Sequence, residues 1–157
     1  MSHIDISKLK WVKVIHDPSG WAYTCDRIKE MPNAIDFNYV TIFPLGFRTD
    51  KANQIEAADQ IALIQNGKLT HIVELLDCEA YEEGGWYHRI CRVLWWQPDL
   101  EDWSSLHPQS QLLGFDPMLM DGDPHLIENL KRFGERWNNN GNMTGFRGYL
   151  AERLHES

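Results

Sequence analysis

Apolar positions along the first two thirds of the chain follow patterns typical of β-strands. Two apolar runs, 60–65 and 68–76, are separated only by Asn66-Gly67. Asn-Gly between such runs indicates a two-residue type I′ hairpin, because both turn positions need positive φ. The register expected from a two-residue turn pairs Ile64 with Leu69, Leu63 with Thr70, Ala62 with His71 and Ile61 with Ile72. Both faces of this hairpin are apolar, which favours a central place in the sheet with a helix outside it.

Three further runs predict strands. The first covers 11–15, the second covers 39–43 before Pro44, and the third covers 86–96 between a Gly-Gly turn and a proline. In the third run Trp95 and Trp96 are neighbours and must point to opposite faces. A short helix is expected over 25–31. The chain therefore has at least five strands and belongs to the α+β class.

The C-terminal third predicts helices. Asp123 is a good N-cap, and Pro124 suits the first helical position. The apolar stripe expected on this helix is Leu126, Ile127, Leu130, Phe133 and Trp137, and the segment 138–141 ends it. A second short helix capped by Thr144 is expected to carry Phe146, Tyr149, Leu150 and Leu154 onto the core. The segment 99–122 has no regular pattern and is long for a loop, which favours a role in lining a site.

Length and charge limit the possible functions. The 157 residues are 43% hydrophobic and contain no linker or repeat, so residues 1–157 are expected to form a single domain. The net charge is −8, and the segment 50–128 alone carries four basic against fifteen acidic residues. That balance argues against binding along a long phosphate backbone. The chain ends are slightly basic, so a short nucleic-acid contact remains compatible with the charge.

The sequence also favours a cytoplasmic protein without a membrane segment. Three cysteines are an odd number at irregular spacing, which suits a reducing compartment. No apolar run is long enough to cross a membrane, and the N-terminus lacks the regions of a signal peptide.

No residue pattern predicts catalysis, a metal or a cofactor. Residues of zinc-ligand type are His71, Cys78, His88 and Cys91. His88 and Cys91 are three apart on one predicted strand and face opposite ways, which argues against one shared ion. Asp116, Asp121 and Asp123 fit turns and a helix cap better than a cation site. No known nucleophile or phosphate-binding motif occurs, and Cys25 with His16 is the closest thiol and imidazole pair. An enzyme is therefore less favoured than a binding protein.

Aromatic residues are the most suggestive candidates for a ligand site. The chain has seven Trp, and several of them adjoin turns, where an indole can stack on a flat ligand. From their loop positions we include Trp21 and Trp103 among the candidate ligand-binding residues.

The order of these segments resembles a known family. The segment 10–18 is similar to the opening of EVE domains, which belong to the PUA-like superfamily with the ASCH and YTH domains. The segments 46–65, 69–74 and 86–96 resemble the family's later strands, although Ala58 stands where the family has glycine before aspartate. The resemblance covers about half the chain and implies a small mixed β-barrel of five or six strands. The alignment places Trp11, Phe47, Arg48, Gln65 and Asn66 in the ligand pocket of such a barrel.

The resemblance implies a non-catalytic reader of a modified nucleotide or short single-stranded RNA or DNA. A base would stack on an aromatic ring, Arg48 would meet a phosphate, and Gln65 or Asn66 would test the base edge. Alternatives are a module that binds a small molecule or peptide, and a protein-interaction domain without a ligand. An unrecognised hydrolase is a further alternative. The oligomeric state expected is a monomer or a weak homodimer.

Overall fold

The computed structural model describes residues 4–96, 103 and 108–156. The described strands form one open, mostly antiparallel sheet in the order β2-β3-β7-β5-β4-β1-β8, with β6 paired to β7. The strands are β1 (Leu9–Ile15), β2 (Ile35–Phe37), β3 (Val40–Phe47), β4 (Gln60–Gln65), β5 (Lys68–Leu75), β6 (Tyr81–Glu83), β7 (Trp86–Trp96) and β8 (His125–Leu126). Among the described strands only β1 and β4 pair in parallel. The fold is α+β, as the sequence predicts.

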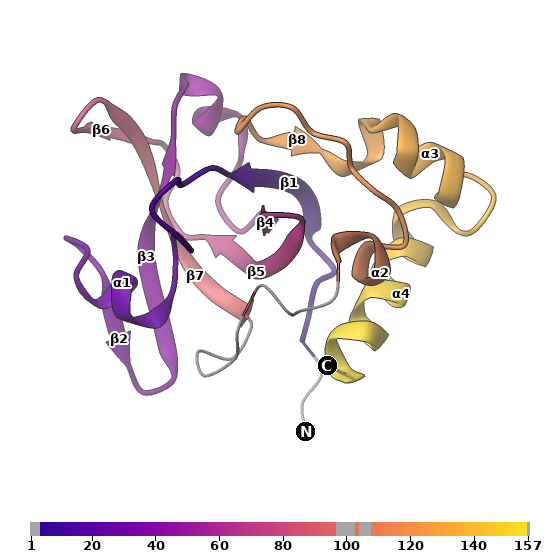
Figure 1. The fold of residues 1–157 in the computed structure, drawn as a ribbon, viewed down its shortest axis with the longest axis horizontal. Coiled ribbons are helices and arrows are strands. Elements are labelled where there is room, and N and C mark those ends of the chain that lie inside the picture. The colour runs from indigo at the N-terminus through magenta and orange to yellow at the C-terminus, as the bar shows by residue number, and fades with distance from the viewer. Residues whose placement is uncertain (1–3, 97–102, 104–107, 157) are drawn as a thin grey trace.

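The helices are short, apart from the last one. They are α1 (Cys25–Lys29), α2 (Gln109–Leu113), α3 (Lys131–Trp137) and α4 (Asn142–Glu156), with 3-10 turns η1 (Asp50–Gln54) and η3 (Ile127–Asn129). Figure 1 shows α2, α3 and α4 together on one side of the sheet, with α1 on the opposite side next to β2 and β3. No helix among the described residues is long and apolar enough to span a membrane.

The central hairpin is confirmed, but its register is only partly as predicted. Ile64 pairs with Leu69 as expected, whereas Leu63 pairs with His71 rather than Thr70. Ala62 and Ile61 pair with Ile72 and Val73, one residue further along than predicted. A β-bulge after the turn inserts one extra residue into β5, and a bulge shifts all later pairs by one. The bulge lets Leu69 and Ile72, three residues apart, reach the same core cluster.

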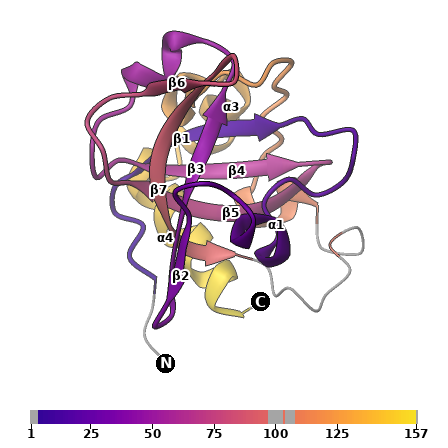
Figure 2. The same ribbon diagram turned by 90° about the vertical axis from the view of Figure 1, so that its left-hand side faces the viewer.

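The sheet separates two hydrophobic clusters. One cluster includes Val12, Ala62 and Ile72 and packs against α2, α3 and α4. The other lies on the opposite face and includes Phe43, Leu63 and Val73. Figure 2 shows β3 and β7 running crosswise to β1, β4 and β5, so the sheet curves around this second cluster. A cleft lined by residues of β1 and β3 opens at the edge of this cluster.

Strand β7 has the predicted limits, and its two adjacent tryptophans face opposite ways. Trp95 packs against the cluster under the helices, and Trp96 packs against the other cluster. Strand β3 continues through Pro44, although the sequence pattern predicts that the strand ends before this residue. Strand β2 pairs only with residues 40–42, so Pro44 lies beyond the covered part of this edge, where a proline is tolerated.

The predicted helix after Asp123 starts later than expected. Asp123 accepts hydrogen bonds from Thr49 and Lys51 instead of capping a helix, and the next residues form β8 along β1. These residues therefore pair with β1 as a strand despite the helical spacing of their apolar side chains, and α3 begins only at Lys131. The last helix is confirmed but begins at Asn142, before the predicted cap. Part of the predicted irregular segment 99–122 lies outside the described residues.

Candidate functional site

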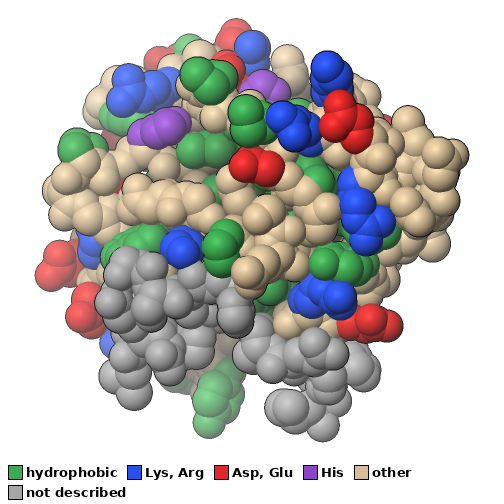
Figure 3. Space-filling model, turned by 45° about the vertical axis from the view of Figure 1, so that its right-hand side comes forward, with side chains coloured by type: hydrophobic (Ala, Val, Ile, Leu, Met, Phe, Trp, Pro, Cys, Tyr) green, Lys and Arg blue, Asp and Glu red, His purple; other side chains and the backbone are tan. Residues whose placement is uncertain are grey.

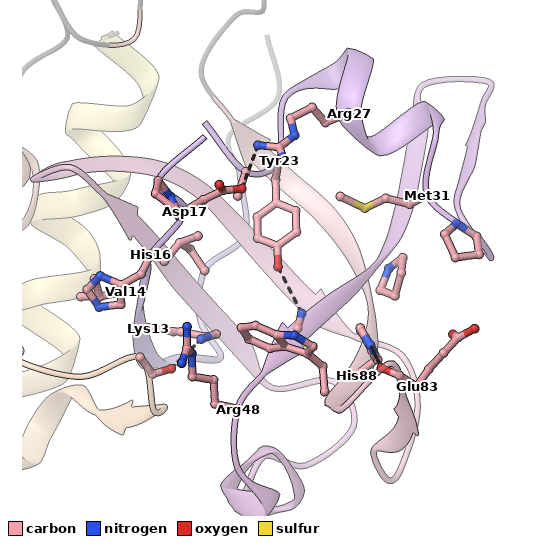
Figure 4. Close-up of a pocket in the computed structure, with 18 of the residues that line it drawn as sticks. Lys13, Val14, His16, Asp17, Tyr23, Arg27, Met31, Arg48, Glu83 and His88 are labelled. Atoms are coloured by element: carbon pink, nitrogen blue, oxygen red, sulfur yellow. Dashed lines mark hydrogen bonds and ion pairs between the residues drawn. The ribbon is translucent and has the colours of Figure 1, made fainter. Parts of the chain in front are cut away.

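A cleft of about 490 Å³ opens between β1, the segment that follows it, β3 and the β6–β7 hairpin. Its lining combines apolar side chains such as Met31 and Pro44 with charged and aromatic ones. In the view of Figure 4, Lys13, His16 and Arg48 lie on one side of the cleft, and His88 and Glu83 lie on the other. A volume of this size is in the range of pockets that bind small molecules.

Gly46 keeps the middle of the cleft open. A Cβ at this position would lie 3.7 Å from the Trp86 ring and 3.7 Å from the Tyr23 hydroxyl, and 4.0 Å from the His88 ring. The point is therefore surrounded by three side chains that line the cleft. A larger side chain at residue 46 would occupy the space that a ligand would use.

Tyr23 joins the segment after β1 to strand β3. The N–H of Gly46 donates a hydrogen bond to the Tyr23 hydroxyl oxygen at 3.1 Å, as Figure 4 shows. Burial raises the pKa of Tyr23 to about 12, so the group stays a neutral hydroxyl at physiological pH. A hydroxyl that accepts one bond can still donate its own proton, so Tyr23 can contribute a donor to a ligand.

Arg48 and Trp86 form a charged, flat surface at one wall. The guanidinium carbon of Arg48 lies 5.0 Å from the centroid of the Trp86 ring, within the range of a cation–π contact. Both side chains are exposed to solvent as well as lining the cleft. The pair offers a planar cation for an anionic group next to an indole for a ring.

The opposite wall contains two polar atoms without hydrogen-bond partners among the described residues. They are the Tyr81 hydroxyl and Nδ1 of His88, and both are buried. The two rings stack with centroids 5.3 Å apart. Nε2 of His88 lies 3.2 Å from the carbonyl oxygen of Glu83 and must be the protonated nitrogen, because a carbonyl only accepts. In the neutral ring Nδ1 is then an acceptor without a hydrogen-bond partner among the described residues.

Lys13 reaches the cleft from β1. Lys13 is only 4% exposed, and its side chain lies on the same face of β1 as the buried side chains of Trp11 and Ile15. The amino group donates to the carbonyl of Gly122 at 2.5 Å and lies 4.9 Å from the centroid of the Phe47 ring. Burial lowers the pKa of Lys13 to about 8, and the carboxylates of Asp123 and Asp121 partly oppose this change.

An ion pair fixes the outer edge of the cleft. Arg27 donates to Asp17 at 2.8 Å and to the carbonyl of Trp21 at 2.9 Å. Hydrogen bonds from Ser19 lower the pKa of the Asp17 carboxyl, and Arg27 adds to this effect. The segment between β1 and α1 is held in place by these bonds.

Four of the predicted site residues lie outside the cleft lining. Trp11 is buried and donates from Nε1 to Asp59, and Phe47 is buried under Lys13. Gln65 is buried too, with its amide bonded to the Gly20 carbonyl and the Ala22 N–H. Gln65 thereby holds the segment between β1 and α1, which forms one wall of the cleft. Asn66 occupies the exposed hairpin turn with φ 51.

The other three predicted residues are divided between two places. Arg48 lines the cleft. Trp21 and Trp103 lie together in an edge-to-face arrangement, with ring centroids 5.5 Å apart and planes inclined at 66°. Trp103 is buried and also contacts the ring of His71 at 5.6 Å. These two indoles form a separate aromatic cluster and do not line the cleft.

Sequence reasoning missed most of the cleft. Lys13, Tyr23, Tyr81, Trp86 and His88 line it, but none of them is among the candidate ligand-binding residues. A signal was present for Lys13, because a lysine at an inward-facing position of a predicted strand needs an explanation. The Tyr81 and His88 pair depends on the short strand β6, which the sequence pattern did not predict.

The described residues contain no group of three or more His, Cys, Asp or Glu side chains placed to hold a metal ion. His71 is buried, with ring nitrogens 2.8 Å from Thr70 Oγ1 and from the Tyr23 carbonyl. Cys91 is buried against the carbonyl of Phe43, and burial raises the pKa of its thiol.

Comparison of the chain with protein-family models, with curated proteins and with solved structures finds no match in any of the three.

Proposed function

We propose that the protein is a non-catalytic binding domain that recognises a nucleotide, modified or as part of a short single-stranded nucleic acid, in the cleft beside Gly46. The ring of the ligand would lie against Trp86, and its phosphate would face Arg48. Tyr81 and His88 would meet the polar edge of the base. A small-molecule ligand with a flat ring and an anionic group is the alternative that the same cleft supports.

The observation that carries this proposal is the pair of unpartnered polar atoms opposite the Arg48–Trp86 contact. Leaving a buried polar group without a hydrogen bond costs roughly 1–3 kcal/mol, so such groups usually have a partner. Both atoms belong to side chains that line the cleft. A base offers N–H and carbonyl groups on the edge of a flat ring, which matches an acceptor and a hydroxyl beside an indole.

The charge distribution favours a short contact. The protein carries a net charge of −8, and on the face drawn in Figure 3 Lys and Arg side chains lie among Asp and Glu rather than in one patch. The cleft differs locally, because Lys13, Arg48 and His16 lie on the same side of it. One phosphate can be bound there, whereas a long backbone would meet the acidic surface.

The fold within this proposal is a PUA-like barrel of the EVE kind. The crosswise halves of the sheet and the position of the cleft at its edge support this reading. Ala58 has φ 72, a left-handed conformation that favours glycine, at the position where the family pattern has glycine. The cytoplasmic location and the monomeric or weakly dimeric state remain predictions from the sequence.

Fluorescence titration tests the proposed function. The ligands are the four ribonucleoside monophosphates, modified nucleotides, and single-stranded RNA and DNA of a few residues, each at low and moderate salt. We expect saturable quenching in the wild type and its loss in Trp86→Leu. Trp21→Leu is the matched control, because Trp21 lies in the other aromatic cluster.

Each outcome of the titration either locates the binding site or argues against it. Because Trp86→Leu also removes a fluorophore, binding to the variants is measured by calorimetry, and binding lost in Trp86→Leu but kept in Trp21→Leu supports the cleft. Binding lost only in Trp21→Leu would move the site to the Trp21–Trp103 cluster. No quenching by any ligand, with circular dichroism showing an intact fold, would overturn the proposal for nucleotides.

A further inference from the structure

Lys13 lines the cleft, but the proposed nucleotide contacts do not use its amino group. Its amino group lies at the end of a buried side chain that lines the cleft and is fixed by the hydrogen bond to Gly122. A buried lysine is uncommon, because taking an ammonium group out of water is costly. A contact with one carbonyl can be made by an exposed lysine as well, so burial suggests a further role.

The surroundings of Lys13 raise the fraction of its side chain that is a neutral amine. Lysines become nucleophiles when they are desolvated in an apolar site or held beside another cation. Burial is the main cause of the lowered pKa of Lys13, about 8, and Arg48 adds to it. At that pKa about a tenth of the amines are neutral at pH 7, against about one in three thousand for a lysine at 10.5.

The charged and titratable groups around this amine come from several segments. Arg48 follows β3, and Asp121 and Asp123 lie on the segment before β8. Asp121 accepts from His125 at 2.8 Å, and Asp123 accepts from Thr49 and Lys51. Both carboxylates therefore have other partners besides the charge of Lys13.

The ring of His16 borders the same small space as the amine of Lys13. A Cβ at Gly122 would lie 3.6 Å from Nζ of Lys13 and 3.6 Å from the ring of His16. The two side chains therefore border the same small space, and His16 lines the cleft as well. An imidazole there can pass protons between the reacting groups and solvent.

We propose that Lys13 captures an aldehyde on the bound nucleotide as a reversible imine. Nζ adds to the carbonyl carbon while the carbonyl oxygen takes up a proton, and the amine loses one. Water then leaves from the carbinolamine as the C=N bond forms, so one amine and one aldehyde give one imine and one water. No oxidant or reductant is needed.

This inference rests on the proposed function, because the nucleotide site is what brings the aldehyde to Lys13. The class of ligand is a nucleotide that carries a formyl group on its base. Arg48 would bind its phosphate and Trp86 its ring, and the formyl group would reach the side of the cleft where Lys13 lies. A nucleotide without an aldehyde would bind in the same place without the covalent step.

Borohydride trapping tests the proposal directly. The intact protein is incubated at pH 7.5 with 5-formyluridine 5′-monophosphate, reduced with sodium borohydride, and analysed by intact and peptide mass spectrometry. Lys13→Arg keeps a positive charge but cannot form the imine. Lys10→Arg is the matched control on the same strand, because Lys10 is 40% exposed and pairs with Asp59.

We expect one adduct per chain, located on Lys13, in the wild type and in Lys10→Arg, and a yield at least about tenfold lower in Lys13→Arg. Adducts spread over several lysines, or none on Lys13, would overturn the inference. Peptide mapping of the wild type decides this even if Lys13→Arg fails to fold. Quenching by uridine 5′-monophosphate without any Lys13 adduct would overturn the imine alone, whereas no quenching by either nucleotide would overturn the proposed function.

Discussion

The guanidinium carbon of Arg48 lies 5.0 Å from the centroid of the Trp86 ring, and the two side chains come from adjacent strands, just after β3 and at the start of β7. Strand pairing fixes this contact, because Phe47 pairs with Tyr87. A planar cation and an indole are thus held together at the wall of the cleft. Arg48 is the one candidate from the sequence that lies in the cleft lining.

Replacing Arg48 is expected to change both affinity and salt dependence. Arg48→Gln should weaken binding of a nucleotide and reduce the slope of log affinity against log salt by about one, as expected for one lost phosphate contact. Arg48→Lys keeps the charge but loses the planar group that stacks on Trp86, so it should retain the slope and lose part of the affinity. Dissociation constants measured at four salt concentrations check both results. An unchanged slope in Arg48→Gln would show that Arg48 contacts no phosphate.

Filling the space above Gly46 is expected to block the cleft. Gly46→Ala places a methyl group in ordinary contact, 3.7 Å from Trp86 and Tyr23, and should bind the ligand with little change. Gly46→Leu extends into the cleft and should abolish binding detected by calorimetry, since overlapping atoms cannot be accommodated in a packed site. Equal affinities in the two variants would place the ligand elsewhere. Thermal unfolding of both variants shows whether the fold is retained.

Local patterns account for the parts of the fold that the sequence predicted. The hairpin around Asn66-Gly67 and strand β7 follow from turn chemistry and β-branched runs, which act over a few residues. The bulge in β5 was not predictable in this way, because it depends on which core cluster Leu69 and Ile72 must reach. The start of α3 likewise depends on β8 pairing with β1, a contact between segments more than 100 residues apart.

The site was less predictable than the fold, because it too depends on contacts between different strands. Tyr81 and His88 are neighbours because the three-residue strand β6 pairs with β7. Trp86 and Arg48 are in contact because β7 lies next to β3. None of these contacts leaves a periodic pattern in the sequence. Trp11 and Phe47 were candidates because the family resemblance places them in the ligand pocket, yet both are buried in the core. Whether Trp21 and Trp103 bind a ligand stays a prediction.

The turn before β4 offers a test of local strain. Ala58 has φ 72, and a left-handed conformation costs a residue with a Cβ roughly 1–2 kcal/mol. We therefore expect Ala58→Gly to raise the free energy of unfolding by up to about 1 kcal/mol, after the greater flexibility of glycine in the unfolded chain is subtracted. Urea unfolding of the two proteins measures this difference. A less stable variant would show that the Ala58 methyl group contributes packing that outweighs the strain.

The buried ion pair between Arg89 and Asp77 is expected to be essential for stability. The Arg89 side chain is fully buried, donates to Asp77 at 2.6 Å, and also binds the carbonyls of Ala52 and Ile55. Arg89→Met leaves these acceptors and the Asp77 carboxylate without the guanidinium, so it should lower the free energy of unfolding by roughly 3–5 kcal/mol.

Arg92→Met is the matched control on the same strand. Arg92 pairs with Glu74 at 3.3 Å, but its side chain is 42% exposed, so the change should cost less than about 1 kcal/mol. Urea unfolding of both variants gives the comparison. Similar losses in the two proteins would mean that burial of Arg89 adds nothing to its contribution.

Lys13 should make stability rise with pH in a narrow window. Its pKa is about 8 in the folded protein and is expected near 10.5 when the chain unfolds, so between these values the unfolded chain binds more protons. Stability increases with pH wherever the unfolded state binds more protons, which gives about 1 kcal/mol between pH 7.5 and 9. From about pH 8.5 the raised pKa of Cys91, and from about pH 10 the raised pKa of Tyr23, act in the opposite direction, because the folded protein then keeps protons that the unfolded chain loses.

Lys13→Met isolates this contribution. The variant loses the hydrogen bond to Gly122 as well as the charge, so the slopes with pH are compared rather than the absolute stabilities. We expect the wild type to gain stability relative to Lys13→Met from pH 7.5 to 9, measured by urea unfolding at intervals across the window. The contributions of Cys91 and Tyr23 are common to both proteins and cancel in the difference. Parallel curves would mean that the amine of Lys13 is not desolvated, and would also remove the physical basis for its reactivity toward an aldehyde.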